Sequence, residues 1–181
     1  MGRGIYQVLL ALAFLIFSGK SAPCGTPARE TAPITVYIFL SETCPICQSE
    51  TIELKALYRE FSPKGVRFVG LFPNETASDA ASVRRFGKKY DLPFTLHIDS
   101  AQTMTQQLGA TITPQVFVTN ATGTVVYQGK IDNGFERIGR RRSVVTAHYL
   151  QSALQQLLNL QLPDPASTEA VGCFISKNKK P

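Results

Sequence analysis

The stretch "ITVYIFLSETCPICQSE", from Ile34 to Glu50, joins an apolar run to two cysteines spaced three residues apart. The run Ile34–Leu40 is rich in β-branched and aromatic residues, which is the pattern of a strand buried on both faces. Cys44 and Cys47 follow this strand after a short polar turn. Two thiols at such a junction can bind a metal, staple a loop or exchange electrons, so the rest of the chain must distinguish these uses.

A helix is predicted directly behind the motif, over "PICQSETIELKALYREF" (Pro45–Phe61). Proline is tolerated only in the first turn of a helix, so Pro45 indicates where this helix begins. Ser41 or Thr43 is the expected N-cap, because a hydroxyl can accept a hydrogen bond from a free N–H group of the first turn. The apolar residues of the helix have amphipathic spacing: Leu54, Leu57, Tyr58 and Phe61.

Strands and helices alternate along the rest of the chain. Ser78 or Asp79 is the expected cap of the second helix, and Ser143 that of the last. The turn "NATG" predicts an antiparallel hairpin. The order of elements predicts an α/β fold, with a mixed central β-sheet flanked by helices on both faces. The predicted elements are strands at 66–72, 94–98, 114–119 and 124–129 and helices over 77–92, 101–109 and 143–160.

The N-terminus has the layout of a signal peptide, predicted over residues 1–22. Arg3 precedes an apolar run, Val8–Phe17, which is shorter than the roughly 20 residues that a membrane-spanning helix needs. The protein is therefore expected to be exported, with tethering by an uncleaved N-terminus as the lesser alternative. A chain of 181 residues suits one domain with tails. The expected organisation is a linker at 23–33, a domain at 34–162 and an irregular C-terminal tail at 163–181.

The chain is basic, with a formal net charge of +6. Its main basic cluster is "ERIGRRR", which contains Arg137 and Arg140–Arg142. No aromatic residues interleave these arginines, as they would on a surface that stacks bases. We interpret the cluster as a solvated loop and expect no nucleic-acid partner.

The cysteine pattern does not favour a metal. A structural zinc site commonly uses two close pairs of Cys or His ligands, whereas this chain has one close pair. The two histidines, His97 and His148, are far apart in the sequence. Neither a metal nor another cofactor is expected. The four cysteines are Cys24, Cys44, Cys47 and Cys173.

A redox pair has a physical basis at this position. The free N–H groups and the positive dipole end of the predicted helix stabilise a thiolate at Cys44. Its pKa should fall from about 8.5 into the range of roughly 3.5 to 7.5. Cys47, one turn later and less exposed, suits the resolving role. A purely structural bridge between them would constrain little chain, because the loop is so short. The expected function is thiol–disulfide exchange with protein dithiols and disulfides.

The order of these motifs resembles the thioredoxin-like superfamily over about Ile34–Leu160. The likeness combines the strand, the Cys-Pro-Ile-Cys sequence that opens a helix, and "ATITPQVFV" (Ala110–Val118) leading into a hairpin and a last helix. The additional helix and strand within Ala77–Met104 resemble the insertion of exported redoxins of the TlpA/ResA type and of peroxiredoxin-like proteins. The resemblance implies a thioredoxin fold, the bacterial periplasm, protein substrates and an upstream redox partner.

The resemblance also implies roles for three further residues. Pro114 would follow a cis peptide bond and shield the thiols from metals, and the backbone of Thr113 would pair with a substrate chain in strand fashion. Glu50 lies six residues after Cys44, where some relatives carry an acid. It would tune the thiols or take a proton. The alternative for Glu50 is an ordinary glutamate of the first helical turns.

Departures from the family pattern leave other functions open. The chain contains no Trp, and Pro-Ile stands between the cysteines, so the direction of electron flow is not assigned. Ser41 lies three residues before Cys44, as Thr or Ser does in peroxiredoxins. The alternative function is therefore a thiol peroxidase with Cys44 as the peroxidatic thiol. A second alternative is a non-catalytic metal- or thiol-binding module.

The tail contains the last cysteine, Cys173, within "TEAVGC". This ending resembles a recurrent tail of uncharacterised bacterial redoxins, and no function comes with that likeness. Cys173 could pair with Cys24, act as a third redox thiol or stay free. Pairing cannot be read from the sequence, so the three interpretations stay open.

Overall fold

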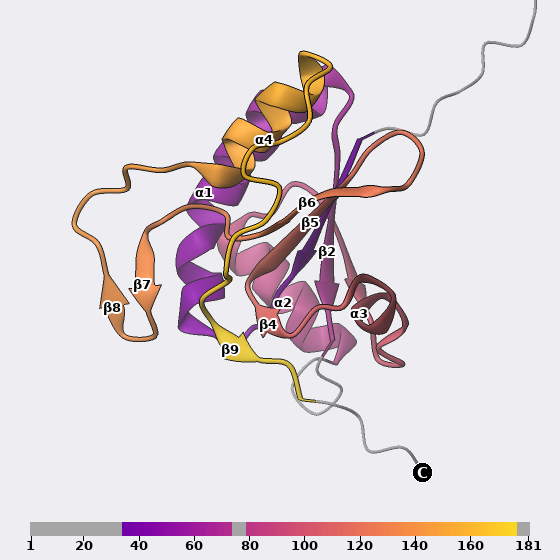
Figure 1. Ribbon diagram of the computed structural model, residues 1–181. Coiled ribbons are helices and arrows are strands. Elements are labelled where there is room, and N and C mark those ends of the chain that lie inside the picture. The colour runs from indigo at the N-terminus through magenta and orange to yellow at the C-terminus, as the bar shows by residue number, and fades with distance from the viewer. Residues whose placement is uncertain (1–33, 74–78, 177–181) are drawn as a thin grey trace, which may run out of the picture. The chain divides into compact units, whose positions relative to one another are not determined.

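The computed structural model describes residues 34–73 and 79–176 of the chain (Figure 1). The predicted signal peptide and the predicted linker lie outside these residues. The elements, in chain order, are β1 (Thr35–Phe39), α1 (Pro45–Phe61), a 3₁₀ turn (Ser62–Lys64), β2 (Arg67–Phe72), α2 (Ala80–Tyr90), β3 (Thr95–Ile98), α3 (Thr103–Leu108), β4 (Ile112–Thr113), β5 (Gln115–Thr119), β6 (Val125–Gly129), β7 (Phe135–Arg137), β8 (Arg140–Arg141), α4 (Tyr149–Leu158) and β9 (Cys173–Phe174).

The central sheet has five strands in the order β3-β2-β1-β5-β6. β1, β2 and β3 are parallel, whereas β5 is antiparallel to both β1 and β6. The mixed sheet and the hairpin after Pro114 are therefore confirmed. β1 lies in the middle and is buried on both faces, as its continuous apolar run predicts: Val36, Ile38 and Phe39 are all 0% exposed.

Helices cover both faces of this sheet. Figure 1 shows α1 and α4 along one face, and their side chains join where Gln151 donates a hydrogen bond to Glu60. The main core on that face combines α1, α2 and α4 with alternate strand residues such as Val36 and Ile38. The opposite core is smaller and contains Phe39, Leu71, Ala110, Phe117 and Ile175, with side chains of α3 packed against it. The helix-on-both-faces prediction is confirmed.

The last helix begins later than predicted. Its N-cap is His148 and not Ser143, so the prediction of Ser143 is wrong. The side-chain oxygen of Asn133 accepts hydrogen bonds from the backbone N–H groups of Thr146 and Ala147. These bonds tie residues 146 and 147 to the loop before β7 and compete with helix formation there.

The C-terminal tail contains ordered pairing where the sequence predicts irregular chain. β9 pairs with β4 in antiparallel fashion, and Ser167 forms a bridge with Gln128 of β6. Strands of two residues carry no periodic pattern, which is why the sequence does not indicate them. In the described part of the chain, every helix is too short or too polar to span a bilayer.

Candidate functional site

Cys44 is the N-cap residue of α1. Its backbone is extended, with φ −81° and ψ 115°, and Pro45 follows as the first helical residue. The predicted caps Ser41 and Thr43 are therefore wrong, and no side chain supplies a capping hydrogen bond. Cys47 lies in the first turn and is 0% exposed, while Cys44 is 1% exposed. The free N–H groups at the start of α1 therefore lie next to Cys44, as the position of Pro45 predicts.

The residues before β5 lie against this pair. The peptide bond between Thr113 and Pro114 is cis, as the resemblance implies. Cys44 Sγ lies 3.2 Å from the carbonyl oxygen of Thr113, to which the protonated thiol donates a hydrogen bond. Thr113 is fully buried, and its side-chain hydroxyl donates a hydrogen bond to the carbonyl oxygen of Cys173 at 3.4 Å. The structure therefore brings Cys44 into contact with Thr113, 69 positions later in the chain, beside the cis-proline.

A third thiol completes the cluster. Cys173 Sγ lies 3.0 Å from Cys44 Sγ and donates a hydrogen bond to it. Cys173 belongs to β9, where it is opposite Thr113 in the antiparallel pair. Among the described residues, Cys44, Cys47 and Cys173 are all free thiols. Cys24, the other pairing partner predicted for Cys173, lies outside the described residues.

The three thiols differ in acidity. Hydrogen bonding with the Cys47 thiol lowers the pKa of Cys44 to about 5; burial acts against this, and the Cys173 thiol adds to it. Burial raises the pKa of Cys47 well above its ordinary value, and Cys44 raises it further. Burial, followed by the hydrogen bond with Cys44, raises the pKa of Cys173 to about 11. Near neutral pH, these pKa values favour a thiolate at Cys44 beside two protonated thiols, and the thiolate is the reactive form of cysteine. The Thr113 contact belongs to the protonated form of Cys44.

This arrangement predicts the pH dependence of Cys44 reactivity. The rate of alkylation of Cys44 by iodoacetamide, followed by peptide mapping, should have a midpoint near pH 5. Because the Cys47 thiol is the largest cause of the lowered pKa, Cys47→Ala should raise the midpoint more than Cys173→Ala. A parent midpoint near the ordinary thiol value of 9, or the reverse order of the two variants, would contradict this assignment.

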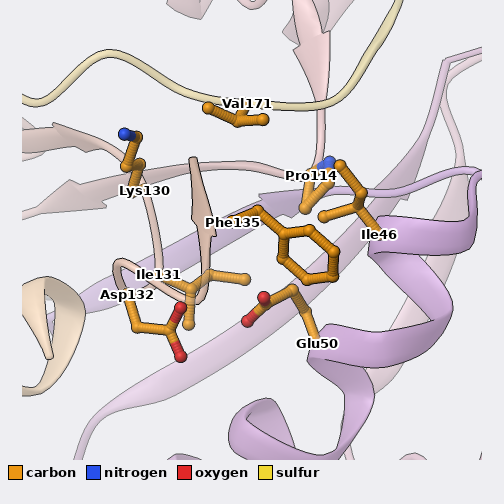
Figure 2. A pocket seen from close by; sticks show the side chains of 8 residues that line it. All are labelled: Ile46, Glu50, Pro114, Lys130, Ile131, Asp132, Phe135 and Val171. Carbon is orange, nitrogen blue, oxygen red and sulfur yellow. The ribbon is translucent and has the colours of Figure 1, made fainter. Parts of the chain in front are cut away.

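Glu50 lies three positions after Cys47 on α1 and lines a small cavity. The cavity is bounded by Ile46, Pro114 and Phe135 among others, and offers about 20 Å³, which is room for one water. Figure 2 shows the carboxyl groups of Glu50 and Asp132 facing the same space. Glu50 is 7% exposed, and its Oε2 atom has no hydrogen-bond partner. Burial, reinforced by the charges of Asp132 and Glu53, raises the pKa of Glu50 to about 8.

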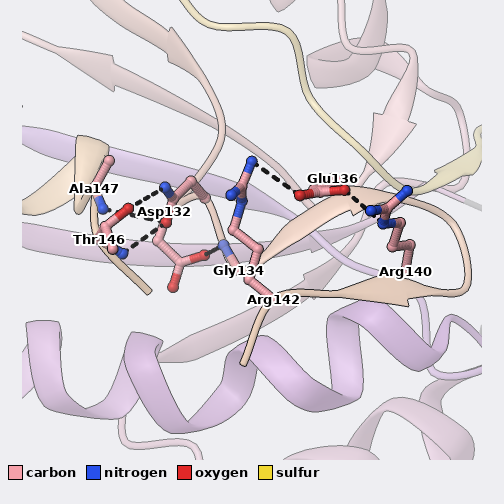
Figure 3. A network of polar contacts seen from close by, with 8 residues as sticks. Asp132, Gly134, Glu136, Arg140, Arg142, Thr146 and Ala147 are labelled. Atoms are coloured by element: carbon pink, nitrogen blue, oxygen red, sulfur yellow. Dashed lines mark hydrogen bonds and ion pairs between the residues drawn. The ribbon is translucent and has the colours of Figure 1, made fainter. Parts of the chain in front are cut away.

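The β7–β8 hairpin lies next to Glu50 and contains the arginine cluster. Glu136 Oε2 lies 2.7 Å from Arg140 Nε, and Glu136 Oε1 lies 3.1 Å from Arg142 Nη2. Figure 3 shows these ion pairs together with the hydrogen bond from Gly134 N to Asp132. Arg141 lowers the pKa of Glu50 slightly against the larger effects that raise it. The arginines of the cluster are exposed to solvent, as the composition predicts, but Arg137, Arg140 and Arg141 belong to a paired hairpin and not to a loop.

Ser41 makes its contacts with Thr43 and with the second thiol of the pair. Its hydroxyl lies 3.1 Å from Thr43 Oγ1, and its backbone N–H donates to Cys47 Sγ at 3.4 Å. The described residues give no hydrogen bond between the Ser41 hydroxyl and Cys44. Ser41 therefore acts on the second thiol of the pair, through its backbone.

The described residues, 34–73 and 79–176, contain no group of three or more His, Cys, Asp and Glu side chains suited to holding a metal ion. The two histidines are separate, as the sequence predicts. His148 caps α4 and lies 3.3 Å from Glu53, while His97 belongs to β3.

The sequence does not indicate that three residues belong to the site: Asp132, Arg141 and Gly172. Asp132 and Arg141 reach Glu50 through the β7–β8 hairpin, and no local pattern signals that approach. Gly172 directly precedes Cys173, and glycine often marks the close approach of two backbones. This glycine is therefore a sequence signal for the contact between the tail and another part of the chain. A Cβ atom at position 172 would overlap the carbonyl group of Thr113.

Curated relatives include two kinds of redox protein. The chain is 30% identical over 100 residues to the thiol-disulfide oxidoreductase ResA of Bacillus cereus, covering 55% of this chain and 56% of the relative. It is 31% identical over 77 residues to the chloroplastic peroxiredoxin Q of Oryza sativa subsp. japonica, covering 42% of this chain and 34% of the relative. The chain thus matches about a third to a half of the length of these relatives.

Solved structures carry the same fold. An uncharacterised conserved protein from Geobacillus kaustophilus superposes with a TM-score of 0.73 at 23% identity, covering 82% of this chain and 79% of that one. StoA from Bacillus subtilis superposes with a TM-score of 0.51 at 17% identity, covering 72% and 84%. A thioredoxin-like fold with a Cys-x-x-Cys helix start facing a cis-proline is the setting of redoxins. The Redoxin family model matches residues 26–139, and the chain therefore belongs to the Redoxin family.

Proposed function

We propose that this protein is a thiol–disulfide oxidoreductase that acts on protein dithiols and disulfides through the Cys44–Cys47 pair. The observation that carries the proposal is the difference in acidity across one helical turn, with a lowered pKa at Cys44 and a raised pKa at Cys47. A stable thiolate is suited to attack a disulfide and to act as a leaving group, whereas a buried, protonated thiol is suited to the later step that resolves the mixed disulfide. The named activity of the ResA relative supports the same class of reaction.

The proposed reaction has two exchange steps. The Cys44 thiolate attacks one sulfur of a substrate disulfide; that bond breaks, and the other substrate sulfur leaves as a thiolate and takes a proton. Cys47 then gives up its proton and attacks Cys44 Sγ. The first substrate sulfur leaves, and the Cys44–Cys47 disulfide remains. The substrate gains two electrons and two protons, and the reverse sequence oxidises a dithiol.

Glu50 is proposed to exchange a proton with Cys47 during resolution. The two residues are three positions apart on α1, so their side chains leave the same face of the helix. With a pKa of about 8, Glu50 can hold or release a proton near neutral pH. The adjoining cavity, with room for one water, supports such a transfer.

The proposal is tested by trapping the intermediate in Cys47→Ser/Cys173→Ser, because Cys173 Sγ lies 3.0 Å from Cys44 Sγ and can also resolve a mixed disulfide. Without these two thiols, the mixed disulfide between Cys44 and a disulfide-containing protein such as insulin should accumulate. Non-reducing electrophoresis and mass spectrometry should detect an adduct that a reductant removes. The matched control, Cys44→Ser/Cys47→Ser/Cys173→Ser, should lack this adduct. If Cys47→Ser/Cys173→Ser forms no adduct although Cys44 remains reactive with alkylating reagents, the proposed activity is wrong.

The same variant tests the peroxidase alternative, which the likeness to peroxiredoxin Q and the position of Ser41 favour. A peroxidatic Cys44 would become a sulfenic acid on treatment with hydrogen peroxide, with or without Cys47. Rapid peroxide consumption by Cys47→Ser/Cys173→Ser, with no protein adduct, would favour this second function.

We further propose that the protein works in an exported, oxidising compartment with an upstream redox partner, which the signal-peptide pattern supports. The reduction potential of the Cys44–Cys47 pair decides its direction. A value near about −270 mV would make it a reductant, and one near about −120 mV an oxidant.

A further inference from the structure

The C-terminal segment, residues 166–176, occupies the backbone edge in front of Pro114. Its strand β9 pairs Cys173 with Thr113 and Phe174 with Ile112. Ile175 N then donates a hydrogen bond to Thr111 O at 2.9 Å. The edge that the sequence assigns to a substrate chain is therefore filled by the protein itself.

The segment is held firmly before β9. Thr168 N donates to Gln128 O at 3.0 Å, and Thr168 Oγ1 accepts from Lys130 N at 2.8 Å. The hydroxyl of Tyr127 also lies 2.9 Å from Thr168 Oγ1. Gly129 has φ +131°, and a Cβ atom there would overlap the carbonyl oxygen of Thr168. The β6 strand thus has a backbone shape that accommodates this segment.

The segment is held again after β9. Ile175 is 9% exposed and belongs to the core cluster that contains Phe39 and Phe117. Gln102 Nε2 donates to Ser176 O at 2.6 Å. At Gly172, any side chain would overlap the Thr113 carbonyl group. The segment is thus anchored on both sides of Cys173, and a glycine lies at the point of closest approach. These features indicate that the fold holds this thiol in a defined position and that the segment is not a loose tail.

We propose that β9 is an internal substrate mimic, and that Cys173 exchanges with Cys44 to form an intramolecular Cys44–Cys173 disulfide. This inference rests on the proposed function, since it uses the Cys44–Cys47 disulfide that substrate reduction leaves. It adds a third redox thiol and a mode of substrate binding: an extended chain that pairs with β4 and presents a sulfur opposite Thr113.

The exchange balances without an external oxidant. Cys173 releases its proton, and its thiolate attacks Cys44 Sγ within the Cys44–Cys47 disulfide. The bond between Cys44 and Cys173 forms as the bond to Cys47 breaks; the bonding pair leaves with Cys47, which takes up a proton. One disulfide and one thiol are present before and after. The sulfurs must approach by about 1 Å from their 3.0 Å separation to reach bonding distance.

The same geometry makes β9 and an external substrate compete. Cys44 is 1% exposed, and an incoming chain can pair with β4 only where β9 has left it. Gly172→Ala should displace β9 from Thr113 while keeping all three thiols. The alkylation rate of Cys44 should then rise roughly fivefold to a hundredfold, the range that follows from the usual free-energy cost of overpacking. Glu169→Ala, at an exposed position of the same segment, is the control and should leave the rate unchanged.

The covalent step is tested by disulfide mapping in Cys24→Ser/Cys47→Ser, whose remaining thiols are Cys44 and Cys173. After equilibration in a glutathione redox buffer, non-reducing mass spectrometry of tryptic peptides should find Cys44 linked mainly to Cys173. Adding Gly172→Ala should lower that yield, and adding Glu169→Ala should not. Cys44 linked to glutathione, with Cys173 as a free thiol, would overturn the inference.

The failure of this inference and that of the proposed function give different results. If the parent reduces insulin but the mapped variant lacks the Cys44–Cys173 link, the inference fails and the function stands. If the link forms but the parent exchanges with no protein disulfide, the proposed function fails, and the three-thiol cluster serves another exchange.

Discussion

Cys44→Ser is expected to remove disulfide reduction completely. A serine hydroxyl does not ionise near neutral pH and cannot form a disulfide, so both exchange steps are lost. The insulin-reduction rate should fall by roughly 10³-fold or more, the scale on which enzymes lose activity with their nucleophile. The fold should be retained, because the exchange replaces one small side chain at a helix N-cap, where serine is well suited.

The controls for Cys44→Ser separate chemistry from structure. Cys173→Ser keeps the nucleophile and the resolving thiol, so insulin reduction should continue. Cys47→Ser/Cys173→Ser should stop turnover but still form the covalent adduct, which Cys44→Ser cannot form. A Cys44→Ser protein that is folded by circular dichroism and retains a tenth of the parent rate would place the nucleophile elsewhere.

The sequence predicts the part of the site that local patterns determine. The apolar run of β1, the helical spacing after Pro45 and the proline at the head of β5 are all short-range features. They fix the order of elements and bring Cys44 and Cys47 to the start of α1. The resemblance to thioredoxin-like proteins adds the partner edge at Thr113. This much is predictable because strand and helix periods appear within windows of fewer than twenty residues.

The rest depends on contacts that no local window contains. Cys173 meets Cys44 across 129 positions, through a strand of two residues in a Pro-rich tail. The pKa of Glu50 is raised first by burial and then by the charge of Asp132, which the loop before β7 places at the cavity. Ser143 fails as a helix cap because Asn133 captures the backbone at residues 146 and 147. In each case tertiary contacts override the local signal.

Glu50→Gln is expected to stabilise the protein at neutral pH. The pKa of Glu50 is raised from 4.5 to about 8, so the folded state binds more protons than the unfolded state between these values. The contribution of Glu50 to the free energy of unfolding is greatest below pH 4.5 and is lost as the pH rises toward 8. At pH 7 the free energy of unfolding is lower by about 3 kcal/mol than it is below pH 4.5. This value follows from the interval of about 2.5 pH units between 4.5 and 7, at roughly 1.4 kcal/mol per unit. Glutamine copies the protonated carboxyl group in shape and does not ionise.

Urea unfolding at several pH values tests the linkage. The difference in free energy of unfolding between Glu50→Gln and the parent should be near zero at pH 4, about 3 kcal/mol in favour of the variant at pH 7, and level above pH 8. Glu60→Gln, at the partly exposed end of the same helix, should show no such rise. A flat difference across the whole range would mean that Glu50 ionises at its ordinary value.

The cost of Glu50 to stability bears on its proposed role. A carboxyl group whose Oε2 atom lacks a partner is a structural liability that an apolar or amide side chain would relieve. If Glu50 exchanges a proton with Cys47, Glu50→Gln should be more stable yet slower in resolving the mixed disulfide, with attack by Cys44 unchanged. Stopped-flow measurement of the two steps separates these effects. A stabilised variant that resolves at the parent rate would remove Glu50 from the proposed proton transfer and leave Cys47 to exchange its proton with solvent.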